Sequence, residues 1–207
     1  MQYQQFNMGK GISISEGIIR PVYSNMNVIF LFLVPFITMR LFAEEKKNHT
    51  IELLMTSPVT LTQIIFGKFL SSFLLVSVML GLTLFYPLIL MITGNPEMGP
   101  ILTNYLGTLL LASCYLSIGM LFSSVTENQI VAGALTFSAG LFFWLVSWAT
   151  ITAGPVWGEF LSYLSLTSHY NNFGQGLVNT SDIFYFLSFI GIGLFLTYRV
   201  LESYRWR

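Results

Sequence analysis

Long apolar runs separated by short polar segments dominate the chain. A helix needs about 20 apolar residues to cross the hydrocarbon core of a bilayer. Five runs reach that length, at residues 22–42, 61–93, 101–123, 130–151 and 182–200. Because a backbone inside lipid must satisfy its own hydrogen bonds, these runs are expected to be helices. The pattern predicts one all-α domain over residues 1–207, a polytopic membrane bundle with about five transmembrane helices.

The second run is longer than one crossing requires. We interpret its start, Leu61 to Lys68, as an interfacial turn that leads into the spanning part. Thr60 and Gln63 have the spacing of a capping box, in which each side chain satisfies a backbone donor of the other residue. Pro35 and Pro87 fall inside apolar runs, where a proline predicts a kink.

Charged residues are concentrated in the first polar loop. Only 9% of the chain is charged, yet six such residues fall within thirteen positions: Arg40, Glu44, Glu45, Lys46, Lys47 and Glu52. The segment from Glu44 to Glu52 predicts a short amphipathic helix within residues 43–58, which Pro58 ends. Such a helix can lie on the membrane surface or pack into a groove on a partner. From periodicity alone, a merely solvated face is the favoured interpretation.

The two faces of this predicted helix differ in chemistry. Its apolar patch is formed by Ile51, Leu54 and Met55. Its polar side is formed by Glu45, Lys46 and Lys47, which are expected to remain in water.

The distribution of Lys and Arg predicts the orientation. Lys10 and Arg20 precede the first run, and the other seven of the nine basic residues flank the first loop or follow the last run. By the positive-inside rule, the first loop, the 123–129 loop and the C-terminus are cytoplasmic. The segment 1–21 is then external, which favours a preceding helix that this sequence does not include.

The segment 152–181 is also expected to be external, because it contains no Lys or Arg. Gly154-Pro155 breaks the chain there, and several aromatic residues suit a membrane interface. We expect a pair of short, half-inserted helices that pack against protein. This re-entrant segment would either gate the external mouth or serve as a structural lid.

Composition excludes several classes of function. A 54% hydrophobic content excludes an ordinary soluble domain, and a net charge of zero gives no electrostatic reason to expect nucleic acid. The single Cys114 lies in an apolar run, which predicts a buried structural thiol. His49 and His169 are far apart in sequence and lack ligand-like neighbours, so neither a metal site nor a cofactor is expected.

Small residues recur at helical spacing inside the spans. One stripe contains Ser113, Ser117, Gly119 and Ser123, another contains Ala132, Thr136 and Gly140, and the last run contains Gly191 and Gly193. Small residues let helices approach closely in lipid. They could line a pathway or a dimer interface, although packing within one subunit is the favoured interpretation. No span carries a charge near its centre, which argues against an ion-coupled carrier.

Two segments resemble a known family. The run MRLFAEEKKNHTIELLMTSPVTLTQIIFGKF is similar to the first loop of ABC-2-type permeases, with matches at Thr50, Glu52, Leu53, Leu54, Ser57 and Pro58. The C-terminal part resembles the gliding-motility-associated branch, with matches at His169, Phe173, Gly176, Leu177, Asp182, Arg199, Val200, Leu201, Glu202 and Ser203. His49 replaces the usual glycine, so a turn with positive φ is less easy there. The family pattern has six spans, so the resemblance implies that the first of them is expected to precede this sequence.

This resemblance implies a permease subunit of an ABC exporter in the bacterial plasma membrane. It implies a second permease subunit, identical or different, and a separate ABC ATPase that binds the first loop. The chain has no GxxxxGK[ST] motif and no paired catalytic groups, so it is not expected to be an enzyme. The expected coupling residues are Glu44, Glu45, Thr50, Glu52, Leu53, Leu54, Met55 and Pro58. The alternative is a non-transporting membrane anchor for a cytoplasmic complex.

Overall fold

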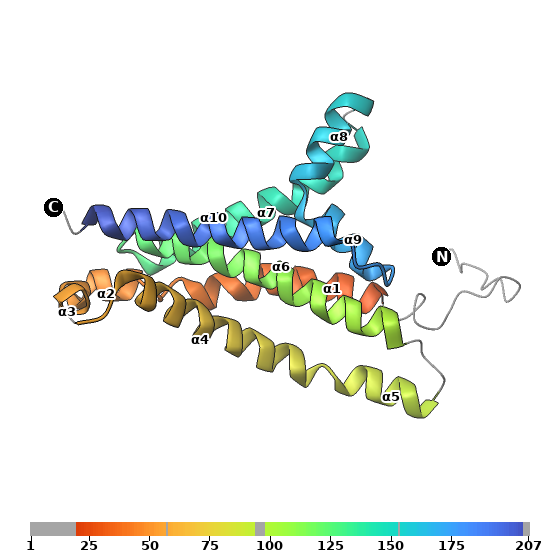
Figure 1. Ribbon diagram of the computed structural model, residues 1–207, viewed down its shortest axis with the longest axis horizontal. Coiled ribbons are helices and arrows are strands. Elements are labelled where there is room, and N and C mark those ends of the chain that lie inside the picture. Colours follow the sequence, from red (N-terminus) through yellow and green to blue (C-terminus); the bar gives the residue numbers. More distant parts are fainter. Residues whose placement is uncertain (1–19, 57, 94–97, 153, 205–207) are drawn as a thin grey trace, which may run out of the picture.

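The computed structural model describes residues 20–204 except 57, 94–97 and 153 (Figure 1), and in that part of the chain every regular element is a helix. The elements are α1 (Arg20–Thr38), α2 (Ala43–Lys47), α3 (Thr50–Thr56), α4 (Leu61–Leu82), α5 (Phe85–Thr93), α6 (Met98–Val125), α7 (Gln129–Thr152), α8 (Gly154–Leu164), α9 (Leu166–Gly174) and α10 (Thr180–Tyr204). Five stretches are long and apolar enough to span a membrane: Asn25–Lys47, Leu61–Ile89, Met98–Val125, Gln129–Thr150 and Thr180–Tyr204. The predicted all-α polytopic bundle is confirmed. The predicted segment 1–21 lies largely outside the described residues.

Helix α6 forms the centre of the bundle. It packs against α1, α4, α7, α9 and α10, and Figure 1 shows it between the other long helices. In its most apolar stretch 72% of the residues are buried, against 22% in the second and fourth spans and 17% in the last. A helix that is apolar on all sides is expected to be surrounded by other helices or lipid. A substitution that alters the packing of α6 therefore affects its contacts with most of the other long helices.

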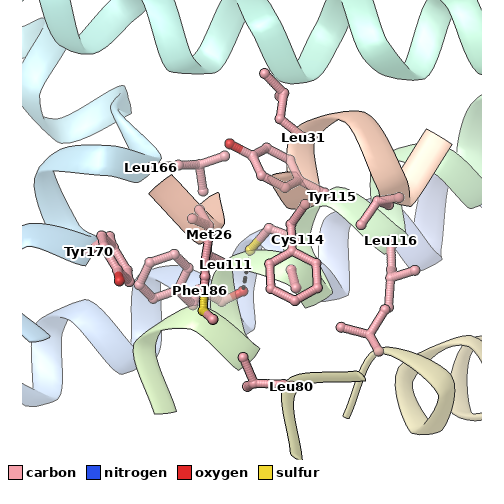
Figure 2. Packing of buried hydrophobic residues seen from close by; sticks show 14 of the residues in the cluster. Met26, Leu31, Leu80, Leu111, Cys114, Tyr115, Leu116, Leu166, Tyr170 and Phe186 are labelled. Atoms are coloured by element: carbon pink, nitrogen blue, oxygen red, sulfur yellow. Dashed lines mark hydrogen bonds between the residues drawn. The ribbon is translucent and has the colours of Figure 1, made fainter. Parts of the chain in front are cut away.

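The main core gathers residues of α1, α4, α6, α9 and α10 around the middle of α6 (Figure 2). Tyr115 and Leu116 of α6 pack there with Leu31 of α1 and Phe186 of α10. Cys114 is fully buried, and its thiol lies 3.8 Å from the carbonyl oxygen of Phe186. The predicted buried thiol is confirmed.

The second span differs from its prediction at both ends. The capping box is confirmed, since the Thr60 hydroxyl accepts from the Gln63 N–H at 3.4 Å and the Gln63 side chain accepts from the Thr60 N–H at 3.0 Å. The expected interfacial turn at Leu61–Lys68 is wrong, because the cap starts one continuous helix there. The break follows Leu82 instead, because the ring of Pro87 would clash with the carbonyl four residues before it in a continuous helix.

Two short helices, α8 and α9, occupy the predicted 152–181 segment, as expected. Helix α9 packs on α6 and α7 and buries Leu166, Tyr170 and Phe173. Helix α8 packs mainly on α7 and stands away from the long axis of the bundle (Figure 1). Its large side chains Trp157, Phe160 and Tyr163 are exposed. Their half-inserted position in a membrane stays a prediction.

Candidate functional site

The candidate site is the connection from the end of α1 through α2 and α3, residues 39–56, which we call the elbow. The single helix expected from Glu44 to Glu52 is wrong, because Asn48 and His49 separate two short helices. His49 adopts a φ of +56°, the only positive φ at a described residue other than glycine. A left-handed residue ends a helix, and histidine enters this region more readily than most residues. The replacement of the usual glycine thus falls where positive φ is required.

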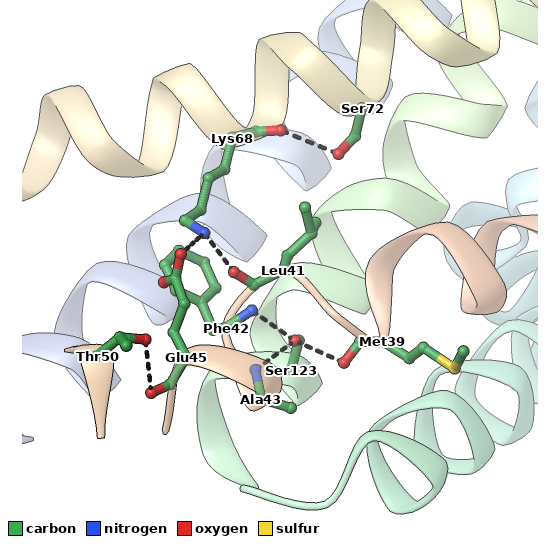
Figure 3. Close-up of polar contacts among 9 residues, drawn as sticks. All are labelled: Met39, Leu41, Phe42, Ala43, Glu45, Thr50, Lys68, Ser72 and Ser123. Atoms are coloured by element: carbon green, nitrogen blue, oxygen red, sulfur yellow. Dashed lines mark hydrogen bonds and ion pairs between the residues drawn. The ribbon is translucent and has the colours of Figure 1, made fainter. Parts of the chain in front are cut away.

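Ser123 of α6 caps the start of α2 from across the bundle. Phe42 precedes α2 and has no side-chain oxygen with which to cap it. The Ser123 hydroxyl accepts from the N–H groups of Phe42 at 3.0 Å and Ala43 at 3.1 Å, and it donates to the Met39 carbonyl at 3.2 Å (Figure 3). One buried hydroxyl therefore satisfies three backbone groups of the elbow. The sequence analysis identified Ser123 only as a small residue, since nothing local connects it to Phe42.

Lys46 is buried, so its expected place on the water-facing side is wrong. Only 3% of the residue is exposed. Its ammonium donates to the carbonyl of Ser124 and lies 3.9 Å from the centre of the Tyr204 ring. The Tyr204 hydroxyl donates to the Glu127 carboxylate at 2.9 Å. The last carbonyls of a helix lack partners within that helix, and both the helix dipole and an aromatic face attract a cation there.

A second lysine, Lys68 of α4, holds the other side of the elbow. Its ammonium lies 2.5 Å from the Glu45 carboxylate and donates to the Leu41 carbonyl at 2.5 Å (Figure 3). The Glu45 backbone carbonyl accepts from the Thr50 hydroxyl at 3.2 Å. Glu45 therefore turns toward α4 and is half-buried, contrary to the expectation that its side chain remains in water. The charge that holds it comes from another span, which the loop sequence alone does not reveal. The role of Glu45 in coupling stays a prediction.

The outer surface of the elbow carries most of the other predicted coupling residues. Ile51, predicted to belong to the apolar patch, is buried with Phe42 and so belongs to the inner side. Leu54 is half-buried, and the Met55 side chain lies outside the described residues. The exposed members are Glu44, Thr50, Glu52 and Leu53 of the elbow and Pro58 just after it. Leu53 is 73% exposed, the highest value among those large apolar residues of the elbow whose side chains the structure describes.

Three separate segments meet at this end of the bundle. Lys46 comes from the elbow, Glu127 from the loop after α6, and Tyr204 from the end of α10. The distribution of Lys and Arg assigned these segments to one side of the membrane, and the structure places them together. That this side is cytoplasmic stays a prediction.

The predicted stripes of small residues lie between helices of this chain. A Cβ at Gly119 would lie 2.1 Å from the Thr38 hydroxyl, and one at Gly140 would lie 2.7 Å from Leu31. A Cβ at Gly193 would lie 2.7 Å from the Ser117 hydroxyl. At Gly191 a Cβ would meet nothing within 4 Å, so the favoured packing within one subunit does not hold there, and a pathway or dimer interface stays a prediction.

Hydroxyls of these stripes return to their own helices. Ser113 donates to the Leu109 carbonyl at 2.7 Å, Ser117 to the Cys114 carbonyl at 2.8 Å, and Thr136 to the Ala132 carbonyl at 2.7 Å; all three residues are buried. Each hydroxyl is thus satisfied by the backbone of its own helix. A role of these residues in a pathway stays a prediction.

A second polar cluster lies at the opposite end, where α9 meets α10. The His169 Nδ1 atom is 2.6 Å from the Asp182 carboxylate, whose other oxygen accepts from Asn172 at 2.8 Å. The His169 ring stacks on Tyr185 with 4.0 Å between ring centres. The expectation that His169 lacks a ligand-like neighbour is wrong, because the turn before α10 brings Asp182 back to it. Among the described residues no three His, Cys, Asp or Glu gather closely enough to hold a metal.

Comparison with known families identifies the chain. The family described as "ABC-2 family transporter protein" matches residues 2–201, which include nearly every described helix. The chain belongs to the ABC-2 transporter family. No curated protein matches it. As an ABC-2 protein it is the membrane component of an ABC transporter, a multi-pass permease whose family works with an ABC ATPase.

Proposed function

We propose that this ABC-2 protein is one permease subunit of a bacterial ABC exporter, in which a separate ATPase docks on the outer surface of the elbow. Family membership supports the permease role. The observation that carries the docking site is the two-sided build of the elbow. Its inner side is held by Ser123, Lys46 and Lys68, while Glu52 and Leu53 point outward.

This build suits a coupling element. A device that transmits a change between two sites needs a rigid body whose contacts differ between the two states. The exposed Leu53 offers an apolar anchor, and Glu44 and Glu52 offer carboxylates that fix its register on a partner. Because α2 and α3 are short and separately anchored, a push on α3 would be passed into the bundle.

The orientation follows from the same proposal. The elbow faces the cytoplasm of the bacterium, where ATP is hydrolysed, because seven of the nine basic residues flank the first loop or follow the last apolar run in the sequence. The exposed Trp157, Phe160 and Tyr163 of α8 then lie at the outer interface, where aromatic residues are enriched. This supports a half-inserted α8 at the external mouth.

The substrate pathway would run between this subunit and a second permease. In this chain the hydroxyls of Ser113, Ser117 and Thr136 are buried and bonded to their own helices. They therefore offer little to a polar substrate inside one subunit. The resemblance of the C-terminal part favours the gliding-motility-associated branch and a role in the cell envelope.

Co-purification from native cells in mild detergent tests the proposal. The native chain should carry an ABC ATPase with it, and Glu52→Lys and Leu53→Ser should each lose that ATPase without lowering the amount of permease in the membrane. Glu159→Lys is the matched charge reversal at the opposite end, and Val59→Ser is the matched polar change at an exposed apolar residue outside α3. Both controls should retain the ATPase. Recovery of a soluble complex without any ATPase would favour the membrane anchor and overturn the proposal.

A further inference from the structure

We infer that Lys46 is a positioning residue that passes movement of the elbow to the end of α6 and to α10. The inference rests on the proposed function, because it requires an ATPase that moves the elbow. The chain itself connects the elbow only to α1 and α4, so covalent continuity directs movement into the first two spans. The contacts of Lys46 lead elsewhere, to Ser124 and Tyr204.

The ammonium of Lys46 resists separation of α2 from α6. It is buried, and its contacts are the Ser124 carbonyl near the end of α6 and the face of the Tyr204 ring. If α2 moved away alone, a buried charge would lose its partners, and that loss is costly in a poorly solvated site. The two segments therefore move together, and α10 follows through Tyr204.

Glu127 holds the ring of Tyr204, the α10 residue that contacts Lys46, in place. Its carboxylate accepts from the Tyr204 hydroxyl at 2.9 Å, which holds the ring beneath the ammonium. It also places a negative charge near Lys46. Since Glu127 lies between α6 and α7, the contacts among Lys46, Tyr204 and Glu127 bring α2, the α6–α7 loop and α10 together. Ser123 adds a second link from α6 to the start of α2.

The neighbouring Lys47 provides a matched control. It lies on the same short helix and carries the same charge, but it is exposed. Lys46→Met keeps the length of the side chain and removes the charge, and apolar replacement of a buried charged group is often tolerated. Lys46→Met and Lys47→Met thus differ in one property, the buried link to α6 and α10.

Spin labels on the permease–ATPase complex in nanodiscs test the inference. One label is placed at Val125→Cys, at the exposed end of α6, and another at Val59→Cys, just before α4. Trapping the native complex with ATP and vanadate should change the spectra of both labels. In Lys46→Met the response at position 59 should remain and the response at position 125 should be lost, while Lys47→Met should behave like the native chain.

The outcomes distinguish the proposed function from the inferred role of Lys46 in passing movement from the elbow to α6 and α10, which we call the relay. Full response at position 125 in Lys46→Met would overturn the relay, and so would a native complex that responds at position 59 but not at 125. If the native permease binds no ATPase, or neither label responds to trapped nucleotide, the proposed function fails and the relay with it. The amount of ATPase retained by Lys46→Met is the second measurement. It should equal that of the native chain, because α3 is unchanged, whereas general loss of elbow structure would lower it.

Discussion

The two ends of the bundle are held together in different ways. At the elbow, Ser123 and Lys46 form contacts between residues 78 to 84 positions apart. At the opposite end, which we call the α9–α10 junction, His169 and Asn172 contact Asp182 across only 13 and 10 positions. Both ends use buried polar groups. The elbow contacts join remote helices, whereas the contacts of Asp182 join neighbours in the sequence. Helix α9 itself is also tied to α6, because the Thr103 hydroxyl donates to the Phe173 carbonyl at 2.9 Å across 70 positions.

This difference indicates how each end can move. Contacts between neighbouring elements can open while the rest of the bundle stays intact, as one local unit. Contacts that join remote helices break only when those helices separate. The contacts of Asp182 are therefore suited to opening locally near the exposed α8 while α9 stays on α6, whereas the elbow is suited to moving as part of the bundle.

The largest expected effect comes from Gly119→Ala, which disrupts the packing of α6 against Thr38, the last residue of α1 before the elbow. The new Cβ would lie 2.1 Å from the hydroxyl and 2.5 Å from the Cβ of Thr38, which is fully buried and cannot move aside. Overpacking of this kind should cost about 3 kcal/mol of stability. Thermal melting of the purified protein in detergent measures it. Gly191→Ala is the control, since its Cβ meets nothing within 4 Å; equal melting of both variants would contradict this close contact.

Asp182→Ala should weaken the α9–α10 junction alone. His169 and Asn172 both lose their carboxylate partner, which should cost about 2 kcal/mol. Hydrogen exchange followed by mass spectrometry should show faster exchange across α9, with the elbow unchanged. The exposed neighbour provides the control variant Ser181→Ala, which should exchange like the native chain. An equal rise at the elbow would show that the two ends are not independent.

Ser123→Ala is the reciprocal change at the elbow. Its hydroxyl satisfies three backbone groups, and loss of a helix cap costs about 1 kcal/mol. Exchange should quicken over residues 42–47 while α9 keeps its native rate. Ser203→Ala, at an exposed serine near the end of α10, should change neither region. Native exchange over residues 42–47 in Ser123→Ala would refute the cap.

The smallest expected effect is a gain in stability from His49→Gly. Glycine adopts the φ of +56° without the strain that a side chain adds, but it loses more entropy on folding. The net stabilisation should be below about 1 kcal/mol. His49→Val should melt lower, since a β-branched residue is poorly accommodated at positive φ. Asn48→Gly is the control, because Asn48 has a φ of −91° and should gain nothing.

The fold could be predicted from the sequence because its main determinant is local. Each span is a continuous apolar run, and lipid leaves such a run no alternative to a helix. The burial of Cys114 and the capping box at Thr60 follow from the residues immediately around them. The kink predicted at Pro87 also follows from the local sequence, because the proline ring clashes with the carbonyl four residues earlier, and the chain breaks there between Leu82 and Phe85.

The polar details of the site could not be predicted, because they depend on which helices become neighbours. A charged loop gives every lysine the same appearance, yet Lys46 is buried and Lys47 is exposed. The difference comes from Ser124 and Tyr204, which lie far along the chain. Glu45 turns inward for the same reason, since Lys68 of α4 reaches it. Sequence patterns show which residues are chemically able to pair. They do not show which of these residues become neighbours when the chain folds.

The remote cap on α2 has a consequence for biosynthesis. Phe42 leaves the ribosome 81 residues before Ser123 does, an interval on the order of ten seconds at bacterial rates of synthesis. A helix as short as α2 is not stable without outside support. The elbow therefore acquires its final shape only after the third span has been made and inserted. A half-finished chain therefore lacks the surface proposed to bind the ATPase.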